Sequence, residues 1–173
     1  MEKGHTLPFQ NFRNSQFYLY LYTIHVLLKH MKKIKAKLLG KTEIQRSIAR
    51  LSHEIIEKNT NLESLVLIGI RTRGEYLAQR LHKLINKNAG INLPLGTLDV
   101  TFYRDDFRTN LGSPKIGASN ILFEIERKTV ILIDDVVYTG RTIRAAMDEI
   151  FTYGRPSSIQ LGVLVDRGHR ELP

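Results

Sequence analysis

VILIDDVVYTGRT, the stretch from Val130 to Thr142, is the most informative part of this chain. Its first four residues are apolar and predict a strand that is buried on both faces of a sheet. Asp134 and Asp135 stand at the carboxyl end of that strand, and a short loop from Thr139 to Thr142 then begins a helix. Because the ligands of parallel sheets bind beyond the carboxyl ends of the strands, we expect a binding site here.

This loop has the chemistry of a phosphate site beside a sugar site. A helix N-terminus after a glycine-containing turn offers backbone N–H groups to a phosphate, and Thr139 and Thr142 add hydroxyl donors. Two carboxylates beside a phosphate would repel it unless they bind hydroxyl groups or a metal. A ribose 5-phosphate satisfies both parts, with its phosphate in the loop and its hydroxyls on Asp134 and Asp135. Alternatively, the two carboxylates only cap the helix and solvate the strand end.

Other familiar active-site patterns are missing from the sequence. Neither G-x-x-x-x-G-K-[ST] nor G-x-G-x-x-G occurs, which argues against a P-loop nucleoside triphosphatase and against a dinucleotide-binding domain. The six histidines are scattered without the spacing of metal ligands, and no Ser-His-Asp arrangement is evident.

Apolar patterns on both sides of this stretch alternate between helix and strand. Helical spacing predicts one helix over residues 42–58, a second marked by Leu77, Leu81 and Leu84, and a third marked by Ile143, Ala146, Met147, Ile150 and Phe151. Short apolar runs predict strands over Leu65–Ile70, Leu98–Tyr103, Val130–Ile133 and Ile159–Val165. Residues 104–127 are polar and poorly periodic, so we expect a long mobile loop there. The alternation predicts an α/β fold with a mostly parallel sheet flanked by helices.

The composition fits one domain with an ordinary buried core. The chain has 173 residues, of which 42% are hydrophobic and 25% are charged. It contains no cysteine, which excludes disulfides and thiolate metal sites and fits a cytoplasmic location. The net charge of +9 favours polyanionic partners such as phosphorylated substrates, nucleic acid or an acidic membrane surface. The same charge also fits a basic surface without a specific partner.

The first 30 residues differ from the rest of the chain. Phe17–Leu28 is an apolar and aromatic run of 12 residues, whereas a membrane-spanning helix needs about 20. His30–Lys33 does not provide the cleavage site of a secretory signal. We therefore interpret residues 1–30 as an N-terminal extension translated from upstream sequence, with Met31 as the native start and residues 31–173 as the functional domain.

Val130–Thr142 resembles the motif with which type I phosphoribosyltransferases bind 5-phosphoribosyl 1-diphosphate (PRPP). Four further stretches narrow the resemblance to the PyrR family, which combines attenuation of pyrimidine operons with uracil phosphoribosyltransferase activity. These are Gly69–Gly74 (GIRTRG), Tyr103–Asp106 (YRDD), Gly154–Leu161 (GRPSSIQL) and Val165–Pro173 (VDRGHRELP). The resemblance extends from about Lys41 to Pro173 and implies a type I phosphoribosyltransferase fold.

The resemblance implies tasks for individual residues. Thr72 and Arg73 would hold the pyrophosphate of PRPP, and Arg104, which begins the mobile loop, would close over it. Asp134 and Asp135 would bind the ribose hydroxyls, and Arg167 would face the nucleotide. The 5-phosphate would lie in the loop formed by Val136, Val137, Tyr138, Thr139, Gly140, Arg141 and Thr142. The expected catalytic residues are Arg73, Arg104, Asp134 and Asp135.

The implied reaction is attack of uracil N1 on ribose C1 of PRPP, which gives UMP and releases pyrophosphate. Mg²⁺ would arrive with PRPP, so we expect no dedicated metal site in the protein. The resemblance also implies UTP and the leader of a messenger RNA as partners, and assembly into a homodimer or a larger homo-oligomer.

One face of the first predicted helix is basic, as an RNA contact requires. The candidate RNA-binding residues are Arg46, Arg50 and His53 at i, i+4 and i+7, Lys58 near the helix end, and His169 and Arg170 in the last motif. A solvated helix face explains the same pattern. The resemblance therefore leaves two interpretations: an enzyme that also regulates pyrimidine genes, or an RNA-binding attenuator with little or no catalytic activity. A phosphoribosyltransferase for another base is a third interpretation.

The chain stops at Pro173, where members of the family continue for a few tens of residues. That tail adds a strand and part of the hood over the base. We therefore expect an incomplete C-terminal hood, with PRPP binding retained, uracil recognition weakened and some apolar surface exposed.

Overall fold

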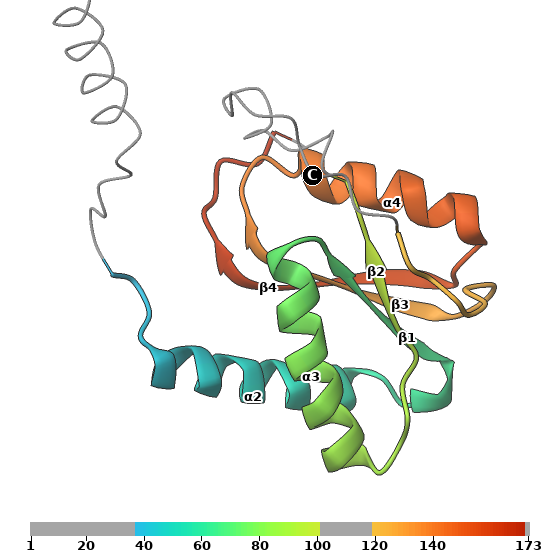
Figure 1. Ribbon diagram of the computed structural model, residues 1–173, viewed down its shortest axis with the longest axis horizontal. Helices are drawn as coiled ribbons and strands as arrows, with labels where there is room; N and C mark the ends of the chain where they lie inside the picture. Colours follow the sequence, from blue (N-terminus) through green and yellow to red (C-terminus); the bar gives the residue numbers. More distant parts are fainter. Residues whose placement is uncertain (1–36, 101–118, 172–173) are drawn as a thin grey trace, which may run out of the picture. The chain divides into compact units, whose positions relative to one another are not determined.

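The computed structural model describes residues 37–100 and 119–171. The chain divides into the units Met1–Leu38 and Leu39–Pro173, and every described element belongs to the second unit. Its helices are α2 (Lys41–Lys58), α3 (Arg73–Ala89) and α4 (Arg141–Tyr153), with a short 3-10 helix η1 (Leu62–Ser64). Its strands are β1 (Leu65–Ile70), β2 (Leu95–Leu98), β3 (Thr129–Val137) and β4 (Ser158–Asp166) (Figure 1). The predicted extension, residues 1–30, lies outside the described residues.

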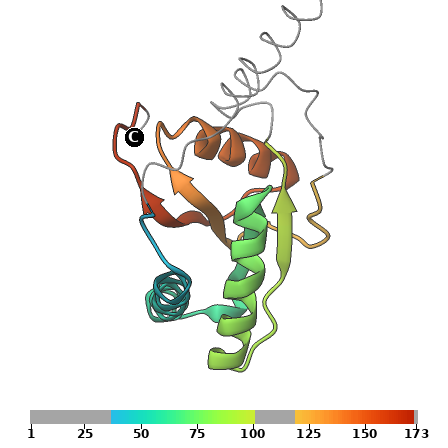
Figure 2. The same ribbon diagram turned by 60° about the vertical axis from the view of Figure 1, so that its left-hand side comes forward.

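The four strands form one parallel sheet in the order β2-β1-β3-β4. β2 and β4 therefore lie at opposite edges (Figure 2). The register aligns Ile68 of β1 with Leu132 of β3, and Leu132 with Leu161 of β4. All six residues of β1 are buried, as expected for a central strand whose two faces are both covered. The predicted parallel α/β fold is confirmed.

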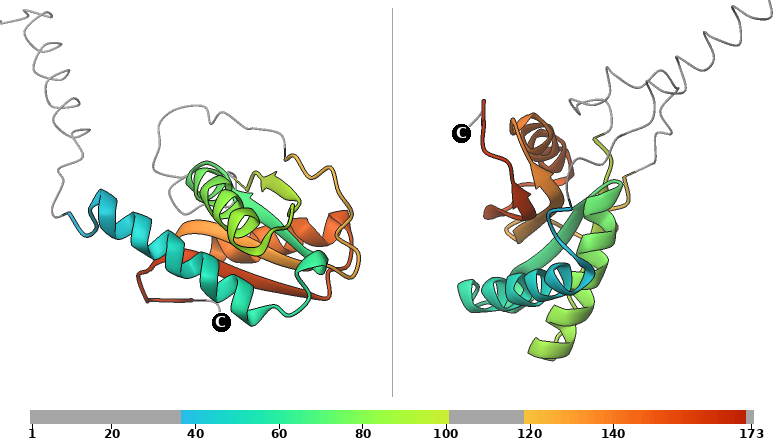
Figure 3. Two further views of the ribbon diagram at one scale, coloured as in Figure 1. Left: turned by 90° about the horizontal axis from the view of Figure 1, so that it is seen from below. Right: turned by 90° about the vertical axis from the view of Figure 1, so that its left-hand side faces the viewer.

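Helices cover both faces of this sheet, as Figure 1 and the left view of Figure 3 show. On one face, α2 and α3 pack on alternate strand residues, and Ile48, Leu81 and Ile131 belong to that core. On the other face, α4 contributes Ala146 and Ile150 to a second core with the strand residues in between. Because successive strand side chains point to opposite faces, one apolar run such as β1 supplies both cores.

The apolar stripes of the helices account for their positions. In α3, Leu77, Leu81 and Ile85 recur at helical spacing and are all buried. The helix ends at Gly90, whose φ of 65° is the left-handed conformation that glycine adopts without a steric penalty. The three predicted helices are confirmed.

Two of the predicted strands differ from the structure by more than one residue at an end. The sequence predicts a strand over Leu98–Tyr103, of which residues 101–103 lie outside the described residues. Among the described residues the strand in this region is Leu95–Leu98. It ends at Leu98 because its neighbour β1 ends at Ile70, the residue paired with Leu98. β3 is longer than predicted and continues to Val137, because β4 pairs with it up to Asp166. The two carboxylates of the central motif thus lie within the last part of β3.

Part of the predicted loop over residues 104–127 is described, namely residues 119–127. Asn120 makes an isolated antiparallel bridge to Thr97, with hydrogen bonds of 2.8 and 3.0 Å between their backbones.

None of the described helices has the length and apolar character to cross a membrane.

Candidate active site

The carboxyl ends of β1 and β3 meet at one edge of the sheet. The two strands are parallel neighbours, so the turn after Ile70 and the acidic end of β3 are brought together. Arg71 closes the end of β1, where its N–H donates to the carbonyl of Leu98 at 2.9 Å. The peptide bond between Arg71 and Thr72 is cis, and α3 begins at the next residue, Arg73.

Two glycines allow the turn after β1 to approach the sheet closely. A Cβ on Gly74 would lie 3.0 Å from Asp134 Cα and closer still to the carbonyl oxygen of Ile133. A Cβ on Gly69 would lie 2.7 Å from Glu75 Cα and 2.8 Å from the side chain of Ala78. Backbone atoms cannot give way cheaply at such distances, so both positions require the absence of a side chain.

This close approach brings Arg73 to the acidic pair. Its guanidinium Nη1 lies 3.3 Å from Oδ2 of Asp135. The Arg73 side chain is 76% exposed, whereas that of Asp135 is 19% exposed. A second arginine of the same turn, Arg71, makes an ion pair of 3.4 Å with Glu75 in the first turn of α3. The turn therefore presents one cation to solvent at the site and anchors the other to its own helix.

The two adjacent aspartates have different surroundings. Asp134 is 2% exposed, and its Oδ1 accepts a 2.8 Å hydrogen bond from the backbone N–H of Asp135. Asp135 retains partial exposure and faces the solvent side of the site. A buried, hydrogen-bonded carboxylate orders the backbone around it, whereas the partly exposed carboxylate is the one placed to accept hydrogen bonds from a ligand.

A cavity of about 320 Å³ lies beside this acidic pair. It is lined by Arg73, Asp135, Val136, Val137, Tyr138, Thr139, Gly140, Thr142, Ile143 and Arg167. Gly140 precedes α4 with φ of 90°, so the chain turns sharply and the helix N-terminus opens toward the cavity lining. Thr139 is 8% exposed, and its Oγ1 accepts from the N–H of Arg141 at 3.4 Å. Backbone N–H groups at a helix start form a favourable anion site.

The segment after β4 packs on this loop. The N–H of Arg167 donates to the carbonyl of Val137, and the N–H of Glu171 donates to the carbonyl of Thr139, both at 3.0 Å. The guanidinium carbon of Arg167 lies 4.2 Å from the ring centre of Tyr138, within cation–π range. Arg167 therefore reaches the cavity from a separate segment and lies over the ring of Tyr138, which also lines the cavity.

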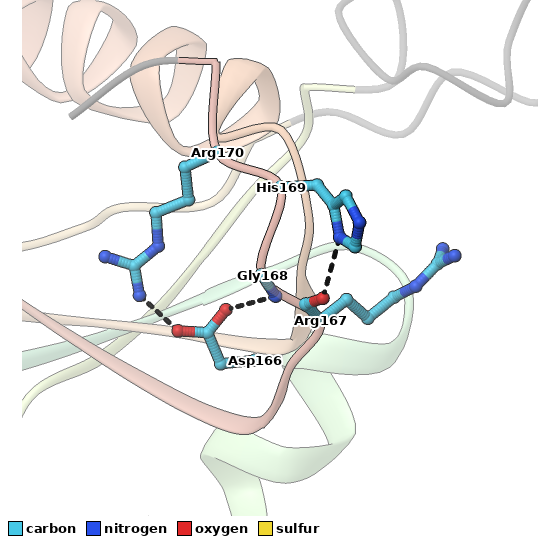
Figure 4. Close-up of polar contacts among 5 residues, drawn as sticks. All are labelled: Asp166, Arg167, Gly168, His169 and Arg170. Carbon is cyan, nitrogen blue, oxygen red and sulfur yellow. Dashed lines mark hydrogen bonds and ion pairs between the residues drawn. The ribbon is translucent and has the colours of Figure 1, made fainter.

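A tight turn holds this segment in shape (Figure 4). Asp166 accepts a 2.9 Å hydrogen bond from the N–H of Gly168 and pairs with Arg170. These interactions, the Gly168 hydrogen bond first and Arg170 second, lower the pKa of Asp166 below its ordinary value of 3.8. Gly168 and His169 both have positive φ, 68° and 61°. In Figure 4 the side chain of Arg170 extends on one side of the turn and that of His169 on the other.

Most of the residues predicted for PRPP line this cavity, namely Arg73, Asp135, Val136, Val137, Tyr138, Thr139, Gly140, Thr142 and Arg167. Thr72, Asp134 and Arg141 adjoin it without contributing to the lining that the described residues form. Arg104 lies outside the described residues. On the predicted RNA surface, Arg46, Arg50, His53 and Lys58 are all exposed on α2, as are His169 and Arg170 after β4.

Sequence reasoning missed three features of this site. Gly74 belongs to the GIRTRG motif, but no role was predicted for it. In the structure only a glycine fits at this position against β3. The contact of Arg167 with Tyr138 and the ion pair of Arg141 with Glu171 also went unpredicted. The pair of glycines at the two ends of the GIRTRG motif, Gly69 and Gly74, was a sequence signal for the close approach to β3. The other two depend on tertiary contacts that spacing does not encode.

The donor set of the site suits a hard cation that is shared with a ligand. Among residues 37–100 and 119–171, no group of three or more His, Cys, Asp or Glu side chains is placed to hold a metal ion. Asp135 nevertheless presents a partly exposed carboxylate to the cavity. Carboxylate oxygen is a preferred Mg²⁺ ligand, and Mg²⁺ commonly combines one or two carboxylates with phosphate oxygens of the substrate.

Comparison with known proteins agrees with this geometry. Residues 36–173 match the phosphoribosyl transferase domain family. The bifunctional protein PyrR of Oceanobacillus iheyensis is 56% identical over 145 residues, which cover 83% of this chain and 80% of that protein. The bifunctional protein PyrR of Thermoanaerobacter sp. (strain X514) is 51% identical over 141 residues, which cover 82% and 79%.

Solved structures show the same fold at lower identity. A hypoxanthine-guanine phosphoribosyltransferase from Bacillus anthracis superposes with a TM-score of 0.63 at 20% identity, over 82% of this chain and 79% of that one. A purine phosphoribosyltransferase from Pyrococcus horikoshii gives a TM-score of 0.59 at 24% identity, over 78% and 80%. At these identities the likeness concerns the fold alone.

Proposed function

Because this chain belongs to the PyrR family of bifunctional proteins and contains the phosphoribosyl transferase domain, we propose that it binds PRPP and transfers the phosphoribosyl group to uracil. The products are UMP and pyrophosphate. The observation that carries this proposal is the cavity lined by Arg73, Asp135 and the loop from Val136 to Gly140. The cation of Arg73 suits the pyrophosphate, the carboxylate of Asp135 suits the ribose hydroxyls, and the loop at the start of α4 suits the 5-phosphate.

In the proposed complex the loop before α4 holds the 5-phosphate. Its backbone N–H groups and the hydroxyl of Thr142 donate to phosphate oxygens. Asp135 accepts hydrogen bonds from the ribose hydroxyls, and the buried Asp134 keeps the strand end in place. These contacts fix ribose C1 relative to the incoming base, which is the main contribution that positioning can make to the rate.

During transfer, uracil N1 forms a bond to ribose C1 as the bond from C1 to the pyrophosphate oxygen breaks, and the N1 proton passes to the departing pyrophosphate or to water. Positive charge develops on the ribose and negative charge on the departing pyrophosphate. Arg73, which is exposed at the start of α3, would stabilise the pyrophosphate. We propose the same task for Arg104, which would also help to exclude water when its loop closes.

Mg²⁺ is the proposed metal, and it would be held by oxygens of PRPP together with Asp135. When bound, it would neutralise part of the negative charge of the pyrophosphate. The carboxylate of Asp135 is the residue-side ligand that supports this assignment, because it is partly exposed and lines the cavity.

The experiment that tests the enzyme proposal follows labelled uracil into UMP with PRPP and Mg²⁺, using the full chain. Hypoxanthine and guanine serve as competing bases, because phosphoribosyltransferases that act on purines share this fold. We expect UMP to form and the purines to be poor substrates. Preferential formation of a purine nucleotide would replace the proposed base, and PRPP binding without any product would favour the regulatory function.

RNA-binding regulation of pyrimidine genes is the second proposed function. It is supported by exposed Arg46, Arg50 and His53, which lie along α2 at helical spacing, and by the bifunctional relatives. UMP and UTP would be the sensed nucleotides and the leader of a messenger RNA the target. Since such a regulator works where RNA is transcribed, we propose a cytoplasmic location. We also propose assembly into a homodimer or a larger homo-oligomer, and light scattering would measure the oligomeric state.

A further inference from the structure

We call Val136–Thr142 the phosphate loop. One of its residues, Arg141, is held away from the cavity. From Asp135 to Ile143, a stretch that the structure describes completely, every residue except Arg141 lines the cavity. The guanidinium of Arg141 instead makes an ion pair with the carboxylate of Glu171. Both side chains are about half exposed, at 57% and 52%. A cation thus lies between two phosphate-loop neighbours, Gly140 and Thr142, yet is turned toward an internal anion.

Glu171 belongs to a segment that is fastened to the same loop. We call Asp166–Glu171 the strap. Its amides bond to the carbonyls of Val137 and Thr139, and its turn is closed by the Gly168 N–H on Asp166. The strap therefore presents a carboxylate to the loop from a defined position rather than from a freely moving chain end.

A phosphate in the cavity and the carboxylate of Glu171 are competing anions. A guanidinium binds carboxylate and phosphate with the same planar donor geometry, and a dianionic phosphate is the stronger partner. A phosphate at the start of α4 would also repel a nearby carboxylate. Arg141 is the first residue of α4, and both of its neighbours, Gly140 and Thr142, line the cavity, so a phosphate bound there would lie close to Arg141.

We propose that Glu171 is an internal counter-ion of the phosphate loop. It holds Arg141 outside the cavity, and the phosphate of the nucleotide displaces it, recruits Arg141 and loosens the strap. This inference rests on the proposed function, because it requires a phosphorylated ligand in the cavity. The proposal connects ligand binding in the cavity to the protein surface, because the strap carries the exposed residues His169 and Arg170. Occupancy of the phosphate loop would then change how these two basic residues are presented to RNA.

Calorimetry on the full chain with ribose 5-phosphate as the probe tests the competition. The Glu171→Gln variant removes the competing charge, so we expect it to bind ribose 5-phosphate about two- to fivefold more tightly, the effect of one exposed ion pair. Glu171→Asp keeps the carboxylate and should bind nearly as the wild type does. If Glu171 instead only supported the loop, Glu171→Gln would weaken binding, and weaker or unchanged binding would overturn the proposal.

Asp148→Asn is the matched control. Asp148 pairs with Arg144 at 3.9 Å on the exposed side of α4, so this variant changes the net charge equally without touching Arg141. Equal tightening in both variants would reduce the effect to bulk charge and overturn the proposal. A wild type that makes UMP while Glu171→Gln changes nothing contradicts this inference alone. A folded wild type that binds neither ribose 5-phosphate nor PRPP contradicts the proposed function as well.

Hydrogen exchange of the wild type gives a second test that needs no variant. Binding of ribose 5-phosphate should slow exchange in residues 137–142 and accelerate it in the strap, where the N–H of Glu171 is bonded to Thr139. Opposite signs in two adjoining segments are the expected signature. Slower exchange in both segments would mean that the ligand tightens the strap, which overturns the proposal.

Discussion

Arg73 and Asp135, which are 62 residues apart in the sequence, form an ion pair of 3.3 Å across the two strand ends. Both residues also line the cavity. In the proposed complex, Arg73 binds pyrophosphate and Asp135 binds ribose hydroxyls, so the ligand takes the place of this ion pair. The pair therefore keeps two ligand-binding groups near their working positions before the ligand arrives.

The first prediction concerns Arg73. Arg73→Ala should weaken PRPP binding by roughly ten- to a hundredfold, the effect of losing a hydrogen bond of about 1.5–3 kcal/mol to a charged group. Thermal stability should hardly change, because an ion pair with a partner that is 76% exposed contributes little. Arg80→Ala, which removes an exposed arginine elsewhere on α3, is the control and should bind PRPP normally. Equal losses in both variants would contradict a specific role.

The second prediction concerns Gly74. Gly74→Ala places a Cβ against the backbone of Ile133 and Asp134, so the turn and the strand must separate. We expect a loss of about 1–3 kcal/mol in unfolding free energy, seen as a lower Tm, together with weaker PRPP binding. Gly90→Ala is the control, since its φ of 65° is strained for alanine but nothing lies within 4 Å. That variant should lose stability and keep PRPP affinity.

Much of the fold was predictable because its helices and strands are periodic and well separated. The three helices and the parallel sheet follow from apolar spacing in the sequence. Strand ends were less predictable, because pairing sets them. β2 ends with its partner at Ile70, and β3 extends past Ile133 because β4 continues beside it. The ends of these strands depend on pairing with neighbouring strands and cannot be predicted from the residues of one strand alone.

The third prediction is a pH dependence in the strap. Because the folded-state pKa of Asp166 is lowered, its ionised form stabilises the turn above pH about 4, and that contribution is lost as the pH falls through the lowered value. NMR titration of the Asp166 carboxyl should give a pKa below 3.8. In Arg170→Ala the pKa should rise only partly, because the Gly168 hydrogen bond is the larger cause. A wild-type pKa at or above 3.8 would contradict this description of the turn.

The fourth prediction concerns RNA. Arg46→Ala combined with Arg50→Ala should weaken binding to a pyrimidine-operon leader RNA. The dependence of log K on log salt should also become shallower by about 0.7 for each lost phosphate contact to a single strand. Lys83→Ala combined with Lys87→Ala removes the same charge from exposed positions of α3 and is the control. If both double variants lose equal affinity, the effect is bulk charge and α2 is not the RNA surface.

The site could be predicted in part for a different physical reason. Strand ends of a parallel sheet fall at one edge, so the sequence alone leads one to expect Arg73, Asp135 and the loop after β3 together. Side-chain partners within the site could not be predicted in this way. Asp134 and Asp135 look alike in sequence, yet one is 2% exposed and the other lines the cavity, because strand residues alternate between faces.

The central claim is most directly tested by calorimetry of PRPP binding, with and without Mg²⁺, to the wild type and to Asp135→Asn. This substitution keeps the shape of the side chain and leaves the buried Asp134 untouched. We predict Mg²⁺-dependent binding by the wild type and a loss of at least tenfold in Asp135→Asn, with both proteins folded by circular dichroism. Absence of PRPP binding by the folded wild type, or equal binding by the variant, would contradict the proposed site.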